Sequence, residues 1–252
     1  MAATTRHFEY GDKELAHLRE RERDPALGLV IEEIGMVERL VLPDLFEALV
    51  NQIISQQIST KGAMTIWNRL VEKLGEVTPA AIDKAPVKTI QKCGMSMRKV
   101  SYMKELSRGV LDGSIDLECL HNESDEEVCR RLVTIKGIGA WTAEMLLIFS
   151  MQRPDVFSWG DIAIHRGLRM LHRHRRITLR LFNKYRRRYS PYASVAGLYL
   201  WEIAGGRCGR LKDPAPLSDA QKKIRARASR KRARLDRERA ATADAREKGQ
   251  PS

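Results

Sequence analysis

The stretch "LVTIKGIGAWTAEMLLIF", Leu132 to Phe149, is the most informative part of the sequence. Its apolar residues end one predicted helix near Val133, and Gly137-Ile138-Gly139 form a turn. A second helix, almost wholly apolar, begins near Ala140. Two glycines one residue apart permit a tight turn at the start of a helix. The stretch therefore predicts two helices joined by a short hairpin.

The hairpin also predicts a binding function. Backbone N–H groups and the helix dipole at the start of the second helix can hold a phosphate. Such a contact does not depend on the identity of a base. We expect Gly137, Gly139 and Thr142 to contact a phosphate backbone, with Lys136 facing a phosphate. A plain turn between two helices is the alternative, because a single G-x-G is a weak signal.

Signals for helix starts recur along the rest of the chain. Potential N-caps precede apolar stripes at Asp44, Thr78, Ser96 and Ser124, and Ser190-Pro191 opens a further helix. Alternating, β-branched strand patterns are scarce. We therefore expect an all-α protein of roughly ten short helices.

The domain organisation follows from where apolar residues occur. Residues 1–217 are expected to form the helical core, and beyond Pro216 apolar residues almost vanish. Residues 218–252 are therefore expected to be a basic tail, either disordered or a solvated helix.

The formal net charge of +13 makes an acidic polymer the first partner to consider. The charge is uneven, because Lys222 to Arg239 contain ten Lys or Arg against two acids, a local excess of +8. Residues 240–252 sum to zero, so residues 1–221 carry only +5. The predicted core is thus mildly basic.

The four cysteines do not have the close spacing of a zinc or iron–sulfur site, so free thiols are expected. They are Cys93, Cys119, Cys129 and Cys208. No apolar run reaches the roughly 18 residues needed to cross a membrane, and the N-terminus has no apolar signal core. We expect a cytoplasmic protein without a membrane partner.

A candidate carboxylate follows the hairpin in "RPDVFSWGDIAIHRGL", Arg153 to Leu168. Asp161 precedes a predicted helix, and local sequence alone favours a simple N-cap there. Asp155 is the alternative carboxylate in the same segment.

The hairpin string, L-x-x-I-x-G-I-G-x-W-T-A, together with "PDVFSWGD", resembles the helix-hairpin-helix (HhH-GPD) superfamily of DNA glycosylases. It is most similar to the 3-methyladenine DNA glycosylase II branch, without that branch's N-terminal β-domain. The resemblance covers roughly Asp24 to Arg210. It implies a two-lobed helical fold with the active site in the cleft between the lobes, a central lobe at about 44–160 and a second lobe made of 1–43 and 161–217. It implies that Asp161 is catalytic and that Asp155 is structural. The branch often has two adjacent aspartates, and here Gly160 takes the place of the first.

The resemblance also implies one activity rather than two. Members that cut the strand attack the sugar with a lysine amine. Trp141 stands where that lysine would be, and Lys136 is offset from it. Only Cys208 lies where other members have four iron–sulfur cysteines, so no cofactor is expected. A monovalent or divalent cation at the hairpin is left open.

A base pocket and a DNA wedge are implied in the same way. Trp141 and Trp201 match pocket tryptophans of the branch, although either can be an ordinary core residue. Met145 replaces a pocket tyrosine. The segment "NQIISQQIST" resembles the one whose side chain fills the gap left by a flipped base, with Gln57 as first choice and Gln56 as second. A polar helix end without a special role is the alternative.

Together these features predict a monofunctional DNA glycosylase of base excision repair. Its expected substrate is an alkylated purine of the 3-methyladenine type in double-stranded DNA, and its product is an abasic site. Removal of hypoxanthine or an oxidised purine is an alternative, and a non-catalytic DNA-binding module is a second one. We expect a monomer, associated with the nucleoid in a bacterium or located in the nucleus in a eukaryote.

Overall fold

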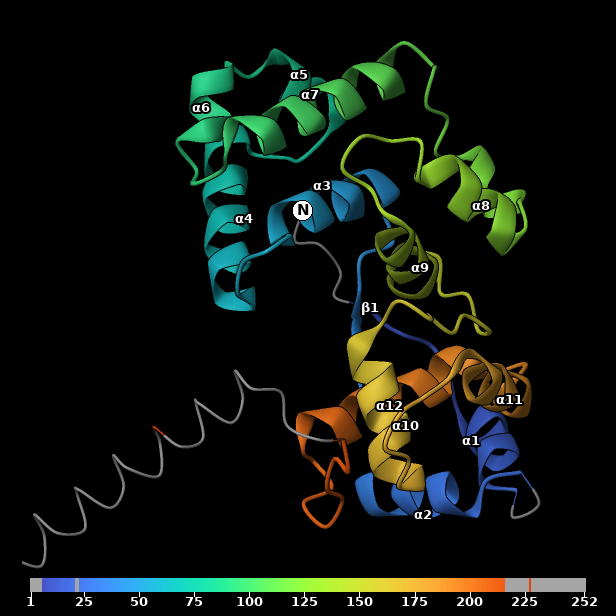
Figure 1. The fold of residues 1–252 in the computed structure, drawn as a ribbon. Coiled ribbons are helices and arrows are strands. Elements are labelled where there is room, and N and C mark those ends of the chain that lie inside the picture. Colours follow the sequence, from blue (N-terminus) through green and yellow to red (C-terminus); the bar gives the residue numbers. More distant parts are fainter. Residues whose placement is uncertain (1–5, 21–22, 216–226, 228–252) are drawn as a thin grey trace, which may run out of the picture.

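The computed structural model describes residues 6–20, 23–215 and 227, and these form twelve α-helices and two short strands (Figure 1). The predicted all-α fold is confirmed. The predicted tail, 218–252, lies outside the described residues except for Arg227. The helices are α1 (Asp12–Arg19), α2 (Pro25–Ile34), α3 (Leu45–Ser55), α4 (Thr60–Leu74), α5 (Pro79–Lys84), α6 (Val87–Gln91), α7 (Met97–Leu111), α8 (Asp125–Leu132), α9 (Ala140–Phe149), α10 (Ile162–His172), α11 (Leu179–Tyr189) and α12 (Ala193–Gly205).

Side-chain caps start several helices where the sequence predicts them. The Asp44 carboxylate accepts a hydrogen bond of 2.8 Å from the backbone N–H of Glu47 at the start of α3. Thr78, Ser96 and Ser124 cap α5, α7 and α8 in the same way. Each cap satisfies a backbone donor that the helix itself leaves unpaired.

The start of α12 differs from the prediction. The helix begins at Ala193 rather than directly after Ser190-Pro191. Asp155 accepts hydrogen bonds from the Ser190 hydroxyl at 2.6 Å and from the Ala193 N–H at 3.2 Å. A residue distant in the sequence therefore ties down the first turn, and Asp155 has the structural role that was predicted for it.

The helices gather at two ends of the molecule. Figure 1 shows α1, α2, α10, α11 and α12 at one end and α3 to α8 at the other, with α9 between them. The strands β1 (Arg6–His7) and β2 (Leu40–Val41) pair antiparallel, and the Leu42 N–H then donates to the Phe149 carbonyl at the end of α9. The lobe boundaries stay a prediction. No helix in the described ranges is long and apolar enough to span a bilayer.

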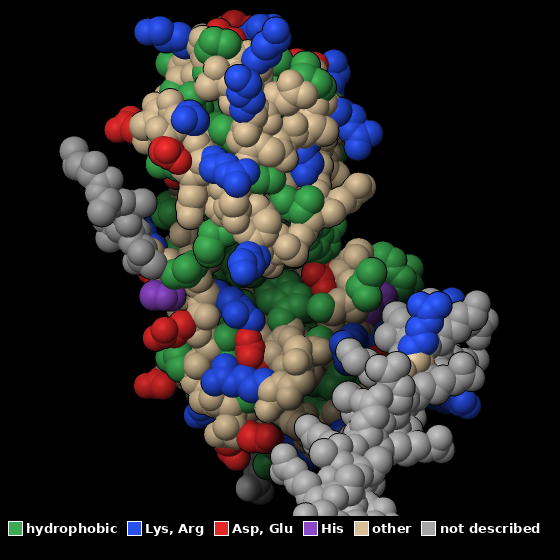
Figure 2. Space-filling model, turned by 90° about the vertical axis from the view of Figure 1, so that its left-hand side faces the viewer, with side chains coloured by type: hydrophobic (Ala, Val, Ile, Leu, Met, Phe, Trp, Pro, Cys, Tyr) green, Lys and Arg blue, Asp and Glu red, His purple; other side chains and the backbone are tan. Residues whose placement is uncertain are grey.

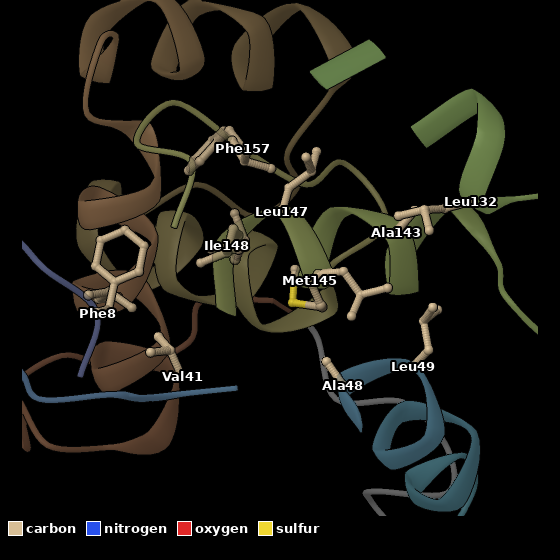
Figure 3. Close-up of a cluster of buried hydrophobic side chains, with 14 of the residues drawn as sticks. Phe8, Val41, Ala48, Leu49, Leu132, Ala143, Met145, Leu147, Ile148 and Phe157 are labelled. Atoms are coloured by element: carbon tan, nitrogen blue, oxygen red, sulfur yellow. The ribbon is translucent and has the colours of Figure 1, made fainter. Parts of the chain in front are cut away.

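The central position of α9 follows from its composition. After its first turn nearly every side chain is buried, among them Met145, Leu147 and Ile148. Figure 3 shows these side chains on α9, with Ala48 and Leu49 of α3 nearby on one side and Phe157 on another. A helix that is apolar on all sides is stable only when it is surrounded. The hairpin at its N-terminus is thereby fixed to the core.

Close packing of α10 on α12 sets the direction of the helix that begins after Asp161. A Cβ atom added at Gly167 would lie 2.4 Å from the backbone oxygen of Leu200. Only glycine allows this approach, because the obstructing atom belongs to the backbone and cannot rotate away.

Candidate active site

The hairpin has the geometry of a backbone anion site. Gly137 has a φ of 89°, and a Cβ there would lie 2.6 Å from the Tyr102 ring. Ile135 and Ile138 are buried and hold the turn against the helices. Gly139 is the N-cap of α9 and has no side chain to cover the helix end.

The first turn of α9 leaves backbone donors available. In the described part of the chain, the N–H groups of Ala140, Trp141 and Thr142 have no backbone acceptor. Such groups, together with the helix dipole, can hold a phosphate. The Thr142 side chain is buried, so its predicted contact with DNA would have to be made by its backbone.

Lys136 is exposed in the hairpin and forms an ion pair of 2.7 Å with Glu105 of α7. The hydrogen bond that the Lys136 amine donates to Glu105 is the main reason that the pKa of Lys136 is raised. The amine is therefore held as a cation. Its predicted contact with a phosphate requires this ion pair to open or to be shared.

Asp161 combines the two roles considered for it. Its Oδ1 accepts from the Ile164 N–H at 2.8 Å, which caps α10. Its Oδ2 accepts from the indole N–H of Trp141 at 2.9 Å. The residue is only 6% exposed, so the carboxylate is fixed at the N-terminus of a helix and mostly removed from water. Two predicted site residues are thus in direct contact.

Trp141 is a surface residue and not a core one. Its side chain is 44% exposed although its indole nitrogen is engaged. A Cβ added at Gly160 would lie 3.7 Å from the Cβ of Trp141, an ordinary contact. Packing therefore does not require glycine at the position where the related branch often has an aspartate.

Glu144 and Ser158 join the site although sequence reasoning did not single them out. Glu144 follows Trp141 by three residues and lies on the same side of α9. The Ser158 hydroxyl donates to the Glu144 carboxylate, which links α9 to the segment that carries Asp161. Burial raises the pKa of Glu144, the Ser158 hydrogen bond opposes the shift, and the Asp161 charge adds to it. The i, i+3 spacing was the only signal available in the sequence.

Met145 lies one helical turn after Trp141 on α9, whereas Trp201 lies farther away, beside Phe149. Met145 is buried in the core cluster (Figure 3). Trp201 is partly buried, and its ring centroid is 5.5 Å from that of Phe149. Phe149 lies eight residues beyond Trp141, or about 12 Å along the helix axis. Their part in a base pocket stays a prediction.

The two candidate wedge glutamines have different environments. The Gln56 amide donates to the Gly137 carbonyl at 2.6 Å, so it joins the loop after α3 to the hairpin. Gln57 is exposed and has a φ of 60°, in the left-handed region that is unfavourable for a residue with a side chain. Lys99 donates to the carbonyls of Ile54 and Gln56 and thereby fixes the same loop.

A cavity of about 980 Å³ opens beside this loop. It is lined by residues from the β2 region, from α3, from the loop after α3 and from α4, including Leu42, Asn51, Ile58, Met64 and Trp67. Figure 2 shows a hollow with hydrophobic side chains between the two ends of the molecule. Its size is sufficient for a base, since small-molecule sites span about 300–1,000 Å³.

The described residues contain no group of three His, Cys, Asp or Glu side chains that could hold a metal ion. All four cysteines are free; Cys93 and Cys208 are buried, and the other two are partly exposed. The expected absence of a cofactor stays a prediction.

Comparison with known proteins agrees with the hairpin and with the fold. The family model of the HhH-GPD superfamily base excision DNA repair proteins matches residues 50–191. DNA-3-methyladenine glycosylase 1 of Schizosaccharomyces pombe is 36% identical over 164 residues, which cover 63% of this chain and 72% of that protein. A solved DNA-3-methyladenine glycosidase of Bacillus halodurans has a TM-score of 0.71 and 32% identity, covering 81% of this chain and 95% of that one.

A second solved structure contains DNA. The 3-methyladenine DNA glycosylase of S. pombe in complex with abasic DNA has a TM-score of 0.64 and 32% identity. It covers 77% of this chain and 97% of the other. The resemblance read from the hairpin and from the Asp161 segment is confirmed, and this chain belongs to the HhH-GPD superfamily of base excision DNA repair proteins.

Proposed function

We propose that this chain is a monofunctional DNA glycosylase that removes alkylated purines of the 3-methyladenine type from double-stranded DNA. It hydrolyses the N-glycosidic bond and leaves an abasic site. The relatives named DNA-3-methyladenine glycosylase support the reaction and the substrate class. The observation that carries the proposal is the buried Asp161 carboxylate, held by the start of α10 and by the exposed Trp141.

The carboxylate fits the charge that develops during the reaction. Cleavage of an N-glycosidic bond builds positive charge on the deoxyribose, and a preorganised anion in a site shielded from water stabilises it. The same carboxylate can orient or deprotonate the attacking water. Two hydrogen bonds hold the Asp161 oxygens in place before the substrate arrives, so little reorganisation is needed.

Trp141 supports selection of the damaged base and the single activity. Its exposed indole offers a face on which a cationic, electron-poor purine stacks more strongly than a neutral one. Because an indole nitrogen cannot form a Schiff base, the reaction stops at the abasic site.

The target base has to leave the duplex first, at a cost of a few kcal/mol. Gln57 is exposed and has a strained backbone, and the next residue, Ile58, lines the cavity, which suits a group that fills the vacated stack. Gln56 donates to the hairpin, so the loop with the candidate wedge is hydrogen-bonded to the element that is expected to hold a phosphate.

Another lesion specificity is the nearest alternative. Met145 in place of a pocket tyrosine favours a broader preference, because methionine is apolar and adaptable. A purely DNA-binding module is disfavoured by the Asp161–Trp141 contact, since phosphate binding requires neither group.

The proposal is tested with duplexes that each carry one lesion: 3-methyladenine or 7-methylguanine, hypoxanthine, and 8-oxoguanine. Abasic sites are scored after alkali treatment, with wild-type protein and with Asp161→Asn as the matched inactive control. We expect release of the methylated purines by the wild type only. Release of hypoxanthine or 8-oxoguanine alone would contradict the proposed substrate class and assign a different one. No release of any lesion would contradict the proposed glycosylase activity itself.

A further inference from the structure

The stretch between Asp161 and Glu202 has an unusual charge pattern. It contains ten Lys or Arg residues and no Asp or Glu. These cations are Arg166, Arg169, Arg173, Arg175, Arg176, Arg180, Lys184, Arg186, Arg187 and Arg188. The mild excess of +5 over residues 1–221 is therefore concentrated here and offset elsewhere in the chain.

Three of the ten form ion pairs within the fold. Arg166 and Arg169 pair with Asp213, and Arg188 pairs with Asp24. The other seven are exposed and have no ion pair with any residue that the structure describes. We call them the arginine-rich surface: Arg173, Arg175, Arg176, Arg180, Lys184, Arg186 and Arg187.

Part of this surface forms a regular stripe on α11. Arg180, Lys184 and Arg187 are spaced four and three residues apart, so they share one face of the helix. They line a shallow concavity with Leu181. The opposite face, with Phe182 and Tyr185, is buried, which fixes the direction of the charged face.

The helix that carries the stripe lies next to the candidate active site, although the stripe is on its opposite face. The Phe182 ring of α11 packs edge-on against Trp159 with a centroid distance of 5.0 Å. Trp159 stands two residues before Asp161 and is 43% exposed. The N-terminal half of α11 therefore adjoins the segment that presents the carboxylate.

Cations around the hairpin form ion pairs with neighbouring glutamates, whereas those of the arginine-rich surface form no ion pair with a described residue. Lys136 pairs with Glu105, Arg130 with Glu127, and Arg131 with Glu123. The hairpin thus offers mainly neutral backbone donors. The three cations of the α11 stripe share one helix face and repel one another, an effect that salt screens over about 10 Å at 0.1 M. A polyanion removes this cost.

We propose that the arginine-rich surface binds the phosphate backbone of the duplex that flanks the lesion, as a second grip beside the hairpin. This inference rests on the proposed function only in taking duplex DNA as the polyanion. The contact is independent of sequence and of damage, because phosphates carry no base information. It supplies electrostatic affinity, while the hairpin supplies register.

The test compares the full-length protein with Arg180→Gln/Lys184→Gln/Arg187→Gln. The matched control, Lys84→Gln/Lys88→Gln/Lys92→Gln, removes the same charge from exposed lysines at the far end of the molecule. Affinity for an undamaged duplex is measured over a range of salt concentrations. Each phosphate contact that is lost reduces the slope of log K against log salt by about 0.9, so we expect a loss of up to about 2.7 for the α11 variant and none for the control.

Equal slopes for the two variants would overturn the proposal. Binding to polyglutamate is measured as well. If the α11 variant loses this binding while its slope of log K against log salt for DNA is unchanged from wild type, the proposal is overturned and the surface is assigned to an acidic polypeptide. Melting temperatures check that both variants are folded, and removal of like charges should not lower them. Excision by the control variant at saturating protein should be unchanged. A wild type that binds with the expected slope but excises nothing would refute the glycosylase and leave the proposal for this surface intact.

Discussion

The indole N–H of Trp141 donates to Oδ2 of Asp161 at 2.9 Å, while Oδ1 of the same carboxylate caps α10. The two residues belong to different segments: Trp141 opens the helix after the hairpin, and Asp161 opens the next helix. The hydrogen bond ties the carboxylate to the element that is expected to grip DNA. The hairpin and the carboxylate that is expected to stabilise the transition state are therefore joined through one side chain, Trp141.

Asp161→Asn should abolish most of the turnover. The amide has an NH2 group in place of one carboxylate oxygen, so one of the two donors, the Ile164 N–H or the Trp141 N–H, loses its acceptor. Loss of the negative charge should reduce single-turnover excision by on the order of a hundred-fold or more. Affinity for undamaged duplex should change little. Excision near the wild-type rate would show that another group stabilises the charge.

Asp161→Ala separates the cap from the charge. It should lose as much activity as the amide and also about 1 kcal/mol of unfolding free energy, because the α10 cap is removed. Chemical denaturation of the two variants side by side measures this difference. Equal stability of the alanine and asparagine variants would mean that the cap contributes nothing.

Trp141→Phe and Trp141→Ala should separate the indole hydrogen bond from the stacking surface. Stacking of a base on an aromatic side chain is worth roughly 1–3 kcal/mol. The alanine variant should therefore lose about ten-fold or more in excision of a methylated purine, and the phenylalanine variant should recover part of it. The exposed position of the ring makes loss of the fold a small concern. Full activity of a folded alanine variant would remove Trp141 from the pocket.

Borohydride should not trap a covalent complex between this protein and damaged DNA. The position of the lysine nucleophile is Trp141, and the nearby Lys136 is held as a cation by Glu105. Strand breaks should appear only after alkali or heat. Efficient trapping would contradict a monofunctional enzyme, and its loss in Lys136→Gln would then identify the amine.

Local patterns predicted the elements of this fold well. The hairpin, the N-caps and the fully apolar α9 each depend on residues within a few positions of one another. Contacts between distant segments were not predictable. The hydrogen bonds of Asp155 to the start of α12, and the Ser158–Glu144 link, depend on how the helices pack. The same is true of Trp201, whose neighbour is set by the crossing of α9 and α12.

Gln57→Gly should improve folding and impair excision. The left-handed backbone of Gln57 is costly for a side-chain residue and easy for glycine, so the change should leave stability equal or raise it by about 1 kcal/mol. Excision should fall because the wedge is gone. Gln56→Ala is the matched comparison: it should cost stability through the lost bond to the hairpin. Unchanged excision in the glycine variant would assign the wedge to another residue.

The stability of the protein should depend on pH through Glu144. Its pKa is raised in the folded state, mainly by burial, from the ordinary value of 4.5. A carboxyl with a raised folded pKa holds its proton more tightly when folded. Its contribution to stability is therefore complete below the unfolded pKa and is lost as the pH rises through the folded pKa. At neutral pH the charged form of Glu144 destabilises the folded state.

Glu144→Gln should remove this destabilisation while keeping an acceptor for the Ser158 hydroxyl. The melting temperature of the variant, relative to wild type, should be higher at pH 7 than at pH 4. Glu72→Gln, which removes the same charge from an exposed position on α4, should show no such trend. A shift that is equal at both pH values, or a larger gain at pH 4, would contradict a raised pKa. Because the neighbouring Asp161 charge adds to the shift, Asp161→Asn should reduce the pH dependence of the Glu144→Gln effect.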